Sequence, residues 1–536
     1  MEHRNRLPHR RTAWFACIAL AWGILGAPSA HAQTAGTNVV QGRLALHWGD
    51  PAPVARQQKA LPARLRAVLL ADDGRRIPLD PVQAKRAAVD LYALANRRVA
   101  VSLPALAQGV SARERFADAI VPADRLAEAA PALGGKQVAA AAAVMGNTRW
   151  VTLMCKFSDI ATEQKNQAFF ASQYGNAVGQ LGHYWSEVSY GQINLAGSSA
   201  YGWFALPKPR SGYVTMVDGK EDADLDRLFQ DCVTAADAQV DFTGVQGINM
   251  MFNGDLDGYA WGGGACAMMD GARRCPRATW NPPWSFANLA PLAHEMGHGY
   301  GLPHSDNSDG DDDTYDNPWD VMSDGWRNAV SDPVYGTRPK HINMIQRDRL
   351  GWVASARKWV VPAGLSGSWQ FELEYAALAD GTGRQLVVLN TPDQIDPAFT
   401  VSYTLEARNR TGTYEGGLAG TAVIVHRVRG GTAYSEDADF PPANVANNEG
   451  SMFKVGETWS APNGGYRLRV DGTTARGFLV TLTAGGQVTG GPLLPRTGAP
   501  PVSSVKPATP ATGNNRISPR PALQRRAPFR DPRRIR

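Results

Sequence analysis

The sequence predicts a mixed α/β fold with a twisted sheet, followed by an all-β sandwich. Three observations support this prediction. Between residues 148 and 355, apolar runs typical of strands alternate with segments of helical periodicity. From 356 to 484 the apolar residues follow a period of two, with turn residues between the runs. A histidine-rich segment at 294–304 has the spacing of a helix that carries a metal site.

The chain has 536 residues, which predicts about three folded units. A hydrophobic content of 43% and 15 Trp indicate globular, core-forming material. The net charge of +6 is uneven, because residues 485–536 carry +9 and residues 1–32 carry +3, which leaves the rest at −6. An acidic body does not favour a nucleic-acid partner.

Residues 1–32 are interpreted as a signal peptide. Four arginines precede an apolar run at 13–27, which is too short for a comfortable membrane span. The small residues around Ala30–Ala32 predict cleavage after Ala32, and the alternative is an uncleaved anchor. We therefore expect a secreted protein, extracellular or periplasmic, with no stable membrane insertion after cleavage.

Residues 33–147 form a first region with predicted strands near 65–70 and 99–103. An Ala-rich stretch at 137–145 is interpreted as a flexible or helical connector. The region is either a propeptide, which is the first interpretation, or an accessory domain that stays attached. It contains no cysteine that could block a metal, so the sequence leaves the mode of inhibition open.

Residues 148–355 are predicted to form one mixed α/β domain, in which strands and helices alternate and a histidine-rich helix comes last. That last helix is expected to begin near Phe286, with Ser285 as its N-cap. A further helix is expected at 339–350, with His341 at its start as a surface or capping residue. The other expected elements are a strand at 150–157, a helix from about 163 to 188, a strand at 193–195, a helix at 225–236 and a strand at 248–252.

The pattern H-E-x-x-H-x-x-G-x-x-H spans 294–304. On a helix, His294 and His298 project from the same face, where they can bind one zinc ion. Gly301 can end the helix and return the chain, which brings His304 in as third ligand. The fourth position is expected to be open to water, as in a catalytic zinc site. Glu295 is predicted to be the general base.

The alternative is a chance match, since a bare H-E-x-x-H occurs in many helices. The extended pattern also requires the glycine and the third histidine, which makes chance alignment improbable. Met322, in the tight turn 319–323, supports a metal site because such a turn can form the structural floor beneath the zinc. Elsewhere a lone methionine is more often core filler.

The segment 306–316 contains six Asp and imitates an EF-hand loop only loosely. It either binds Ca²⁺ as a second cofactor or is a solvated acidic loop.

Residues 356–484 contain five runs of period two and predict a β-sandwich-like domain, whose role the sequence leaves open. The runs are 370–374, 385–389, 400–405, 422–426 and 478–482. Residues 485–536 are rich in Pro and Arg and are predicted to be a disordered tail. The tail either contacts an anionic cell surface or stays solvated.

Signal cleavage would remove Cys17 and leave four cysteines, an even number that suggests two disulfides. Cys266 and Cys275 are close in sequence and are expected to form a disulfide that closes one loop. Cys155 and Cys232 would then pair by elimination, or remain ordinary buried thiols.

Several segments resemble the metzincin metallopeptidases, in particular gametolysin-type peptidases and the related immune-inhibitor-A group. The resemblance rests on the zinc pattern and on four further segments, and it covers about residues 148–355 well. His304 favours the gametolysin side, whereas Gly299 departs from the Asn that is common there. The four segments are the strand ending in Phe-Ser-Asp at 150–159, HYWSEVSYG at 183–191, WDVMS at 319–323 and LGW at 350–352.

The resemblance implies a metzincin-like catalytic domain and a secreted zinc endopeptidase, a zymogen made with a leader and a C-terminal β domain. The expected metal ligands are His294, His298 and His304, with Glu295 catalytic and one Zn²⁺ as cofactor. The expected partners are peptides and extracellular or cell-wall proteins. Two alternatives are a secreted binding or adhesion protein that uses the zinc fold as a scaffold, and a zinc hydrolase of non-peptide amides.

Overall fold

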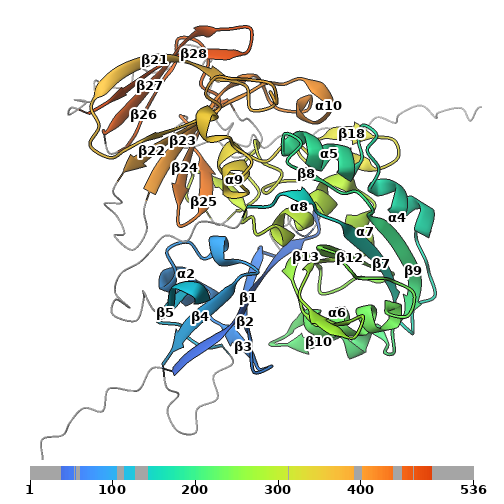
Figure 1. The fold of residues 1–536 in the computed structure, drawn as a ribbon. Helices are drawn as coiled ribbons and strands as arrows, with labels where there is room; N and C mark the ends of the chain where they lie inside the picture. Colours follow the sequence, from blue (N-terminus) through green and yellow to red (C-terminus); the bar gives the residue numbers. More distant parts are fainter. Residues whose placement is uncertain are drawn as a thin grey trace, which may run out of the picture. The chain divides into compact units, whose positions relative to one another are not determined.

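The structure is a computed structural model that describes residues 38–53, 55, 61–104, 114–126, 143–311, 313–391, 401–438, 449–462 and 464–485. The predicted signal peptide, most of the connector at 137–145 and all but the first residue of the predicted tail lie outside these residues. The described chain is a mixed α/β fold with several sheets and few helices, as the sequence predicts in outline (Figure 1). Among the described helices, none combines the length and apolar character that crossing a membrane requires.

A ten-stranded sheet organises the first half of the chain. Its main path runs in the order β3-β2-β1-β13-β16-β12-β7-β9. The strands β7, β9, β12 and β16 are parallel, and β13 is antiparallel to β16. The apolar runs at 150–157 and 248–252 form buried central strands because both of their faces are covered. The bounds are β7 Trp150–Lys156, β9 Ser199–Ala205, β12 Gly247–Phe252, β13 Tyr259–Gly264 and β16 Arg277–Asn281.

The predicted helix 225–236 is confirmed as α6 Leu225–Ala236, whose apolar face joins the core beside β7 and β12. The prediction of one helix from 163 to 188 is wrong. The chain forms α4 Gln167–Gln173 and α5 Leu181–Val188 instead, and Val178 between them is exposed. Gly179 interrupts the helix because its φ of +89° is a left-handed conformation that favours glycine.

The helix predicted to bind the metal is α8 Leu289–Gly299. It begins three residues later than predicted, with Asn288 at the N-cap position. Ser285 lies in a separate short helix, α7 Pro283–Phe286, and its hydroxyl donates to the carbonyl of Pro282. The N-cap prediction for Ser285 is therefore wrong.

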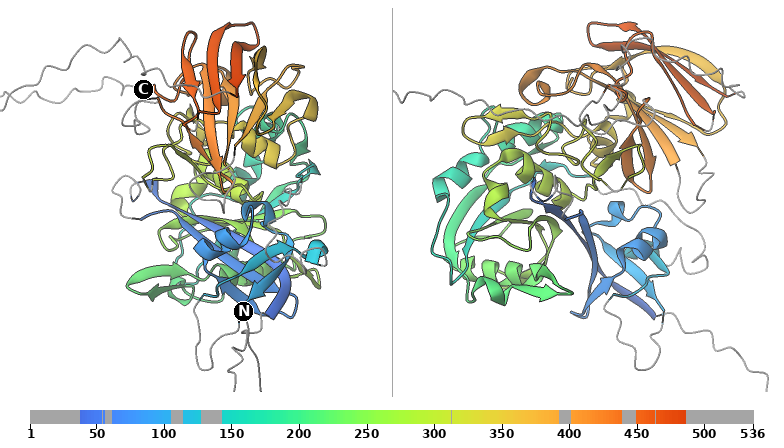
Figure 2. Two further views of the ribbon diagram at one scale, coloured as in Figure 1. Left: turned by 90° about the vertical axis from the view of Figure 1, so that its left-hand side faces the viewer. Right: turned by 180° about the vertical axis from the view of Figure 1, so that it is seen from behind.

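The N-terminal region, which is blue in Figure 2, adds strands to the same sheet. It does so through β1 Asn38–Pro51, which pairs antiparallel with β13. It has an apolar core of its own, formed only by residues between 40 and 120. The predicted strands near 65–70 and 99–103 are confirmed within β2 and β4. The other bounds are β2 Arg64–Ala71, β3 Arg76–Leu79, α2 Pro81–Ala87, β4 Arg98–Leu103 and β5 Ala119–Pro122.

The C-terminal strands form two sheets, in the orders β17-β25-β24-β23-β22-β20 and β21-β28-β27-β26, which share one apolar core. Each of the five predicted runs contains a strand, although β22 begins after Gln385 and residue 400 lies outside the described residues. The strand β17 Ser305–Asn307 pairs with β25, so the pairing crosses the domain boundary predicted at 355/356. The bounds are β20 Lys358–Val361, β21 Gly367–Glu374, β22 Leu386–Thr391, β23 Val401–Arg408, β24 Ala422–Arg429, β25 Thr432–Ser435, β26 Thr458–Ser460, β27 Tyr466–Thr473 and β28 Gly477–Ala484.

The helix predicted at 339–350 is shorter, α9 Met344–Arg349, with Asn343 as its N-cap. His341 precedes it and is fully buried, 2.9 Å from Glu187 on α5. The prediction of a surface or capping histidine is wrong, since the partners of His341 come from other elements. The remaining short elements are β6 Gly146–Asn147, β8 Ile193–Asn194, β10 Val214–Val217, β11 Lys220–Ala223, β14 Ala267–Met269, β15 Ala272–Arg274, β18 Val330–Asp332, β19 Gly336–Arg338 and α10 Gly412–Glu415.

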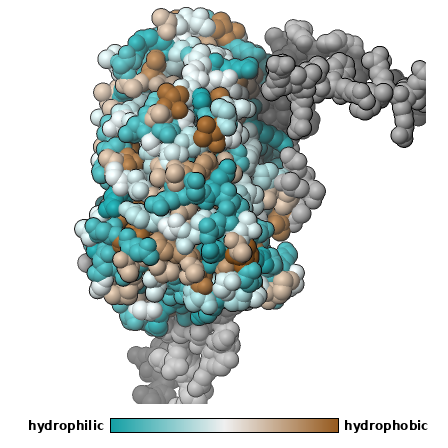
Figure 3. Space-filling view, turned by 90° about the vertical axis from the view of Figure 1, so that its right-hand side faces the viewer, coloured by the Kyte–Doolittle hydropathy of each residue, from teal (hydrophilic) through white to brown (hydrophobic). Residues whose placement is uncertain are grey.

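Both predicted cysteine pairs are bonded. Cys155–Cys232 joins β7 to α6 inside the core, and Cys266–Cys275 closes the loop that contains β14 and β15. On the face shown in Figure 3, hydrophobic residues are scattered among hydrophilic ones and do not gather in one large patch.

Candidate metal centre

The three predicted histidines converge. Nε2 of His298 lies 3.0 Å from Nε2 of His294 and 3.1 Å from Nε2 of His304. The turn that returns the chain begins at Gly301, whose φ is +92°. The N–H of Gly301 donates to the carbonyl of His298, which closes the helix end before the chain reaches His304.

In two of these histidines, a hydrogen bond at Nδ1 fixes the orientation of the ring and therefore the direction in which Nε2 points. Nδ1 of His294 lies 2.6 Å from the carbonyl oxygen of Val321, and Nδ1 of His298 lies 2.7 Å from that of Leu302. A carbonyl only accepts, so both Nδ1 atoms carry a hydrogen, and in the neutral imidazole each Nε2 atom then presents a lone pair. Two lone pairs facing each other at 3.0 Å repel unless a cation lies between them.

A fourth group, which the sequence did not indicate, completes the cluster. Asp50 at the end of β1 places Oδ1 2.8 Å from Nε2 of His304 and 3.2 Å from Nε2 of His294. Its Oδ2 lies 3.3 Å from Nε2 of His298. The four side chains form a buried Asp/His/His/His group that could hold a metal ion. The expectation of an open fourth position is therefore wrong in this structure, because Asp50 fills it.

The spacing of the four groups suits a tetrahedral ion. Ligands about 2.0–2.1 Å from such an ion lie roughly 3.3 Å from one another. The distances between the histidine nitrogens and the Asp50 oxygens run from 2.8 to 3.3 Å. The donor set of three imidazoles and one carboxylate is one that zinc accepts. The residues present therefore fit the metal that the sequence predicts.

Burial sets the protonation of this group. Burial lowers the pKa of His298 to about 3, which keeps its imidazole neutral. Burial alone would raise the pKa of Asp50, but His304 and His294, when they are protonated, hold it well below its usual range. A carboxylate and neutral imidazoles are the ionisation states in which these groups bind a metal.

Glu295 is buried beside the cluster on α8. With Asp50, His294 and Trp326 it lines a cavity of only about 10 Å³. Gly262 on β13 allows this strand to approach the helix, since a Cβ at that position would lie 2.5 Å from the carbonyl oxygen of Glu295. Glu295 thus shares a small cavity with two members of the cluster, Asp50 and His294.

Met322 packs against α8 and does not belong to the Asp/His/His/His group. Its sulfur would lie 2.3 Å from a Cβ at Gly297, so the helix and the turn 319–323 are in close contact. The turn is held by the Asp320 carboxylate, which accepts from the N–H of Met322 at 2.9 Å. The same turn presents the Val321 carbonyl to His294.

A buried charge cluster, missed at the sequence level, supports this turn. Arg408 on β23 donates to the carbonyl of Trp319 at 2.5 Å and pairs with both Glu406 and Glu415. All three charged side chains are fully buried. Burial would raise the pKa of Glu415, but the Arg408 guanidinium lowers it to about 2.

Arg408→Ala is expected to destabilise the fold by about 3–5 kcal/mol, since it leaves two buried carboxylates without their cation. Equilibrium unfolding in urea measures this, with the exposed Arg410→Ala as control. Because the pKa of Glu415 falls from 4.5 to about 2 on folding, the pair stabilises fully above pH 4.5 and loses that contribution toward pH 2. Equal unfolding free energies for the two variants would refute a supporting role.

In the acidic segment the carboxylates of Asp309, Asp311 and Asp316 lie within 4.8 Å of one another and could hold a cation. The EF-hand match uses Ser305, Asn307, Asp309 and Asp316. The observed set differs from it, because Asn307 lies in β17 and its N–H donates to Asp316. Burial, followed by repulsion from neighbouring carboxylates, raises the pKa of Asp316 to about 8.

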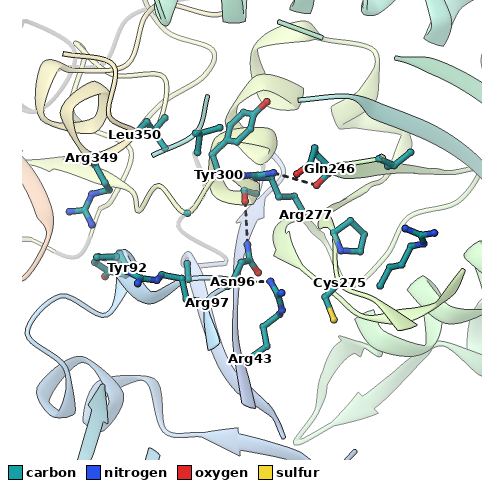
Figure 4. A pocket seen from close by; sticks show the side chains of 18 of the residues that line it. Arg43, Tyr92, Asn96, Arg97, Gln246, Cys275, Arg277, Tyr300, Arg349 and Leu350 are labelled. Carbon is teal, nitrogen blue, oxygen red and sulfur yellow. Dashed lines mark hydrogen bonds between the residues drawn. The ribbon is translucent and has the colours of Figure 1, made fainter. Parts of the chain in front are cut away.

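A larger cavity, of about 330 Å³, contains none of the three histidines (Figure 4). It lies between the N-terminal region and the end of α8. Its labelled lining includes Arg43, Asn96, Arg277 and Tyr300, and Asn96 donates to the carbonyl of Gly299 at 3.3 Å.

The chain was also compared with known proteins. No protein-family model matches the sequence, and a search of curated proteins finds no match either.

Proposed function

We propose that the protein is a secreted zinc-dependent endopeptidase of the metzincin type, similar to gametolysin. The observation that carries this proposal is the convergence of the His294, His298 and His304 Nε2 atoms, with Glu295 adjacent on the same helix. The resemblance of residues 148–355 to metzincins supports the same reaction. The two disulfides are compatible with an extracellular location.

The proposed reaction is hydrolysis of a peptide bond. Zinc held by the three histidines would supply Lewis acidity and lower the pKa of water toward ~7, from ~15.7 in bulk. Glu295 accepts the proton of the attacking water and passes it to the leaving amine. The Nδ1 hydrogen bonds to Val321 and Leu302 hold two of the imidazoles in the orientation that binding requires.

Tyr315 places a hydroxyl group beside the metal centre. Its hydroxyl donates to Oδ1 of Asp50 at 2.7 Å, and its ring lies 5.5 Å from that of His304. A substrate carbonyl that replaces the Asp50 carboxylate would find the same donor as negative charge develops on its oxygen.

Tyr315→Phe is expected to lower kcat about 10²-fold with a smaller change in KM, because the lost hydrogen bond is strongest in the transition state. Steady-state kinetics on a cleaved peptide, in the Asp50→Asn background because Asp50 fills the fourth metal position, measure both constants. The buried Tyr466, whose hydroxyl donates to the carbonyl of Asn390 within the β domain, provides the control Tyr466→Phe. An unchanged kcat in Tyr315→Phe would remove Tyr315 from the reaction.

Two other functions compete with this proposal. A secreted binding or adhesion protein could keep the metal fold as a scaffold, and a zinc hydrolase could act on non-peptide amides. The burial of Glu295 beside the histidines favours a hydrolase over a binding protein, and the digestion test below separates a peptidase from a hydrolase of other amides. Ca²⁺ at the group of Asp309, Asp311 and Asp316, and contact of the basic tail with a cell surface, belong to the same proposal.

The test is mass spectrometry of a peptide library digested by the purified protein, with and without the chelator 1,10-phenanthroline. Because Asp50 fills the fourth position, the Asp50→Asn variant is tested beside the unmodified chain. We expect new peptide termini that disappear with the chelator and return when zinc is restored. No chelator-sensitive cleavage by either protein would favour the binding protein or the hydrolase of other amides.

A further inference from the structure

We propose that the cavity of about 330 Å³ between the N-terminal region and the end of α8 binds a dianionic phosphate group, with Arg43 and Arg277 as its charged contacts (Figure 4). The inference is independent of the proposed peptidase function, because the cavity contains none of the three histidines. It assigns a ligand to a part of the molecule that the proposed reaction does not use.

The charge of the cavity lining is the first observation. Five of its twenty residues are arginines, and none of the twenty is acidic. This concentration of positive charge contrasts with the chain between residues 33 and 484, which carries a net charge of −6. A cleft lined by one sign of charge raises the local concentration of the opposite ion. The five arginines are Arg43, Arg97, Arg274, Arg277 and Arg349.

Two of these arginines, Arg43 and Arg277, form no ion pair with a carboxylate of the described residues. Arg349, by contrast, lies 2.9 Å from Asp90. Burial lowers the pKa of Arg277, and the charge of Arg43 lowers it further. Burial also lowers the pKa of Arg43. Two half-buried guanidiniums that repel each other are stabilised by an anion that contacts both.

The contacts that orient the two guanidiniums leave their charge in place. Arg43 donates to the carbonyl of Asn96 at 2.5 Å. The guanidinium carbon of Arg277 lies 5.1 Å from the ring centroid of Tyr300, and its Nη1 lies 3.5 Å from the carbonyl oxygen of Gln246. Figure 4 shows Arg43 directed toward Asn96, and Arg277 toward Tyr300 and Gln246. A guanidinium has five N–H donors, so each has donors left for an oxyanion.

The two arginines are not needed to cap α8. A helix leaves its last carbonyls without partners inside the helix, and basic side chains often satisfy them. Here the side-chain amide of Asn96 donates to the carbonyl of Gly299 at 3.3 Å. A neutral group therefore satisfies this carbonyl, and the charges of Arg43 and Arg277 are left to be balanced by a ligand.

The size of the cavity favours a phosphate that is attached to a larger molecule. Its volume of about 330 Å³ lies in the range of about 300–1,000 Å³ that is usual for small-molecule sites. Gly299 helps to keep this space free, since a Cβ there would lie 3.0 Å from the ring of Trp150 and 3.4 Å from the Cβ of Arg277. The buried residues Tyr92 and Tyr300 add aromatic surface to the lining. An organic phosphate ester would fill both parts of the cavity.

The number of unpaired guanidiniums favours phosphate over a carboxylate. Arginine binds both groups through parallel hydrogen bonds. A carboxylate carries one charge and would neutralise only one of the two arginines. A phosphate monoester carries a charge of about −1.5 to −2 near pH 7 and has three acceptor oxygens, so one group can contact both arginines.

The test is isothermal titration calorimetry of the zinc-loaded full chain at pH 8, with phenyl phosphate, inorganic phosphate and acetate as probes at one ionic strength. Arg43→Gln and Arg277→Gln are compared with the unmodified chain and with Arg98→Gln. Arg98 is the matched control, because it belongs to the N-terminal region, pairs with Asp72 at 2.5 Å and does not line the cavity. We expect phenyl phosphate to bind most tightly, and each of the two cavity substitutions to weaken it at least about tenfold, since each removes charged hydrogen bonds. Arg98→Gln is expected to match the unmodified chain.

The probes distinguish the source of the phosphate group. Tighter binding of phenyl phosphate than of inorganic phosphate supports an organic ester, and equal affinities support free phosphate, provided that both cavity substitutions weaken them. Acetate that binds as tightly as phosphate would overturn the proposal, and so would the absence of phosphate binding. Equal phosphate affinity in all four proteins would also overturn it, because phosphate bound at the metal centre would not depend on Arg43 or Arg277.

Should the two cavity variants not fold, crystals of the unmodified chain soaked in tungstate decide the question, since tungstate is a phosphate analogue with a strong anomalous signal. An anomalous peak between the guanidiniums of Arg43 and Arg277 supports the site. A map without a peak in this cavity contradicts it, whatever the outcome of the peptide digestion.

Discussion

Replacing Glu295 by glutamine is expected to abolish peptide cleavage while leaving the metal in place. Glutamine has nearly the same volume as glutamate, so the buried space beside His294 stays filled. It cannot accept a proton at neutral pH, and general acid–base catalysis contributes about 10²–10⁴-fold to a rate. We expect kcat/KM to fall by about 10³-fold or more. The kinetics are measured in the Asp50→Asn background, where the site is expected to be accessible.

Metal content distinguishes a lost base from a damaged site. Elemental analysis after dialysis should give the same zinc per chain for Glu295→Gln and for its parent, because Glu295 is not among the grouped ligands. Glu163→Gln is the matched control, since Glu163 is partly exposed and pairs with Lys156 far from the helix in sequence. A zinc-loaded Glu295→Gln protein that turns over normally would exclude Glu295 as the base.

Replacing His304 by alanine is expected to have the second large effect, on metal retention. Loss of an outer-shell partner of a metal ligand already weakens binding about 10–100-fold. Loss of the ligand itself should exceed that range. Nε2 of His304 is also the histidine nitrogen closest to Asp50, at 2.8 Å, so the substitution also removes the shortest contact of the Asp50 carboxylate with the cluster.

Competition with a chromophoric zinc chelator measures the affinity of each variant. His183→Ala is the control, because His183 is partly exposed and its Nδ1 lies 2.9 Å from the hydroxyl of Tyr414, outside the cluster. Equal zinc affinity for His304→Ala and His183→Ala would exclude His304 as a ligand.

The local parts of the site could be predicted from the sequence. The spacing of His294 and His298 follows from the period of a helix, and Gly301 can adopt the left-handed conformation that returns His304. The central strands could be predicted because β7 and β12 are buried on both faces and read as continuous apolar runs.

The other parts depend on contacts between residues far apart in the chain. Asp50 reaches the histidines only through the pairing of β1 with β13, and one aspartate in a strand carries no local signal of a metal. Burial of His341 likewise depends on Glu187 and Glu415, which come from two other elements. Gly179 was a local signal for the break between α4 and α5. The apolar periodicity of residues 174–188 nevertheless favoured one continuous helix.

The central claim is that three imidazoles hold one zinc ion beside Glu295. Anomalous diffraction from crystals of the zinc-loaded full chain, collected on both sides of the zinc absorption edge, tests it most directly. We predict a single strong peak about 2.0–2.1 Å from Nε2 of His294, His298 and His304, with a carboxylate oxygen of Asp50 completing the shell. An anomalous map with no peak among these four side chains, in a protein that retains zinc elsewhere, would contradict the account.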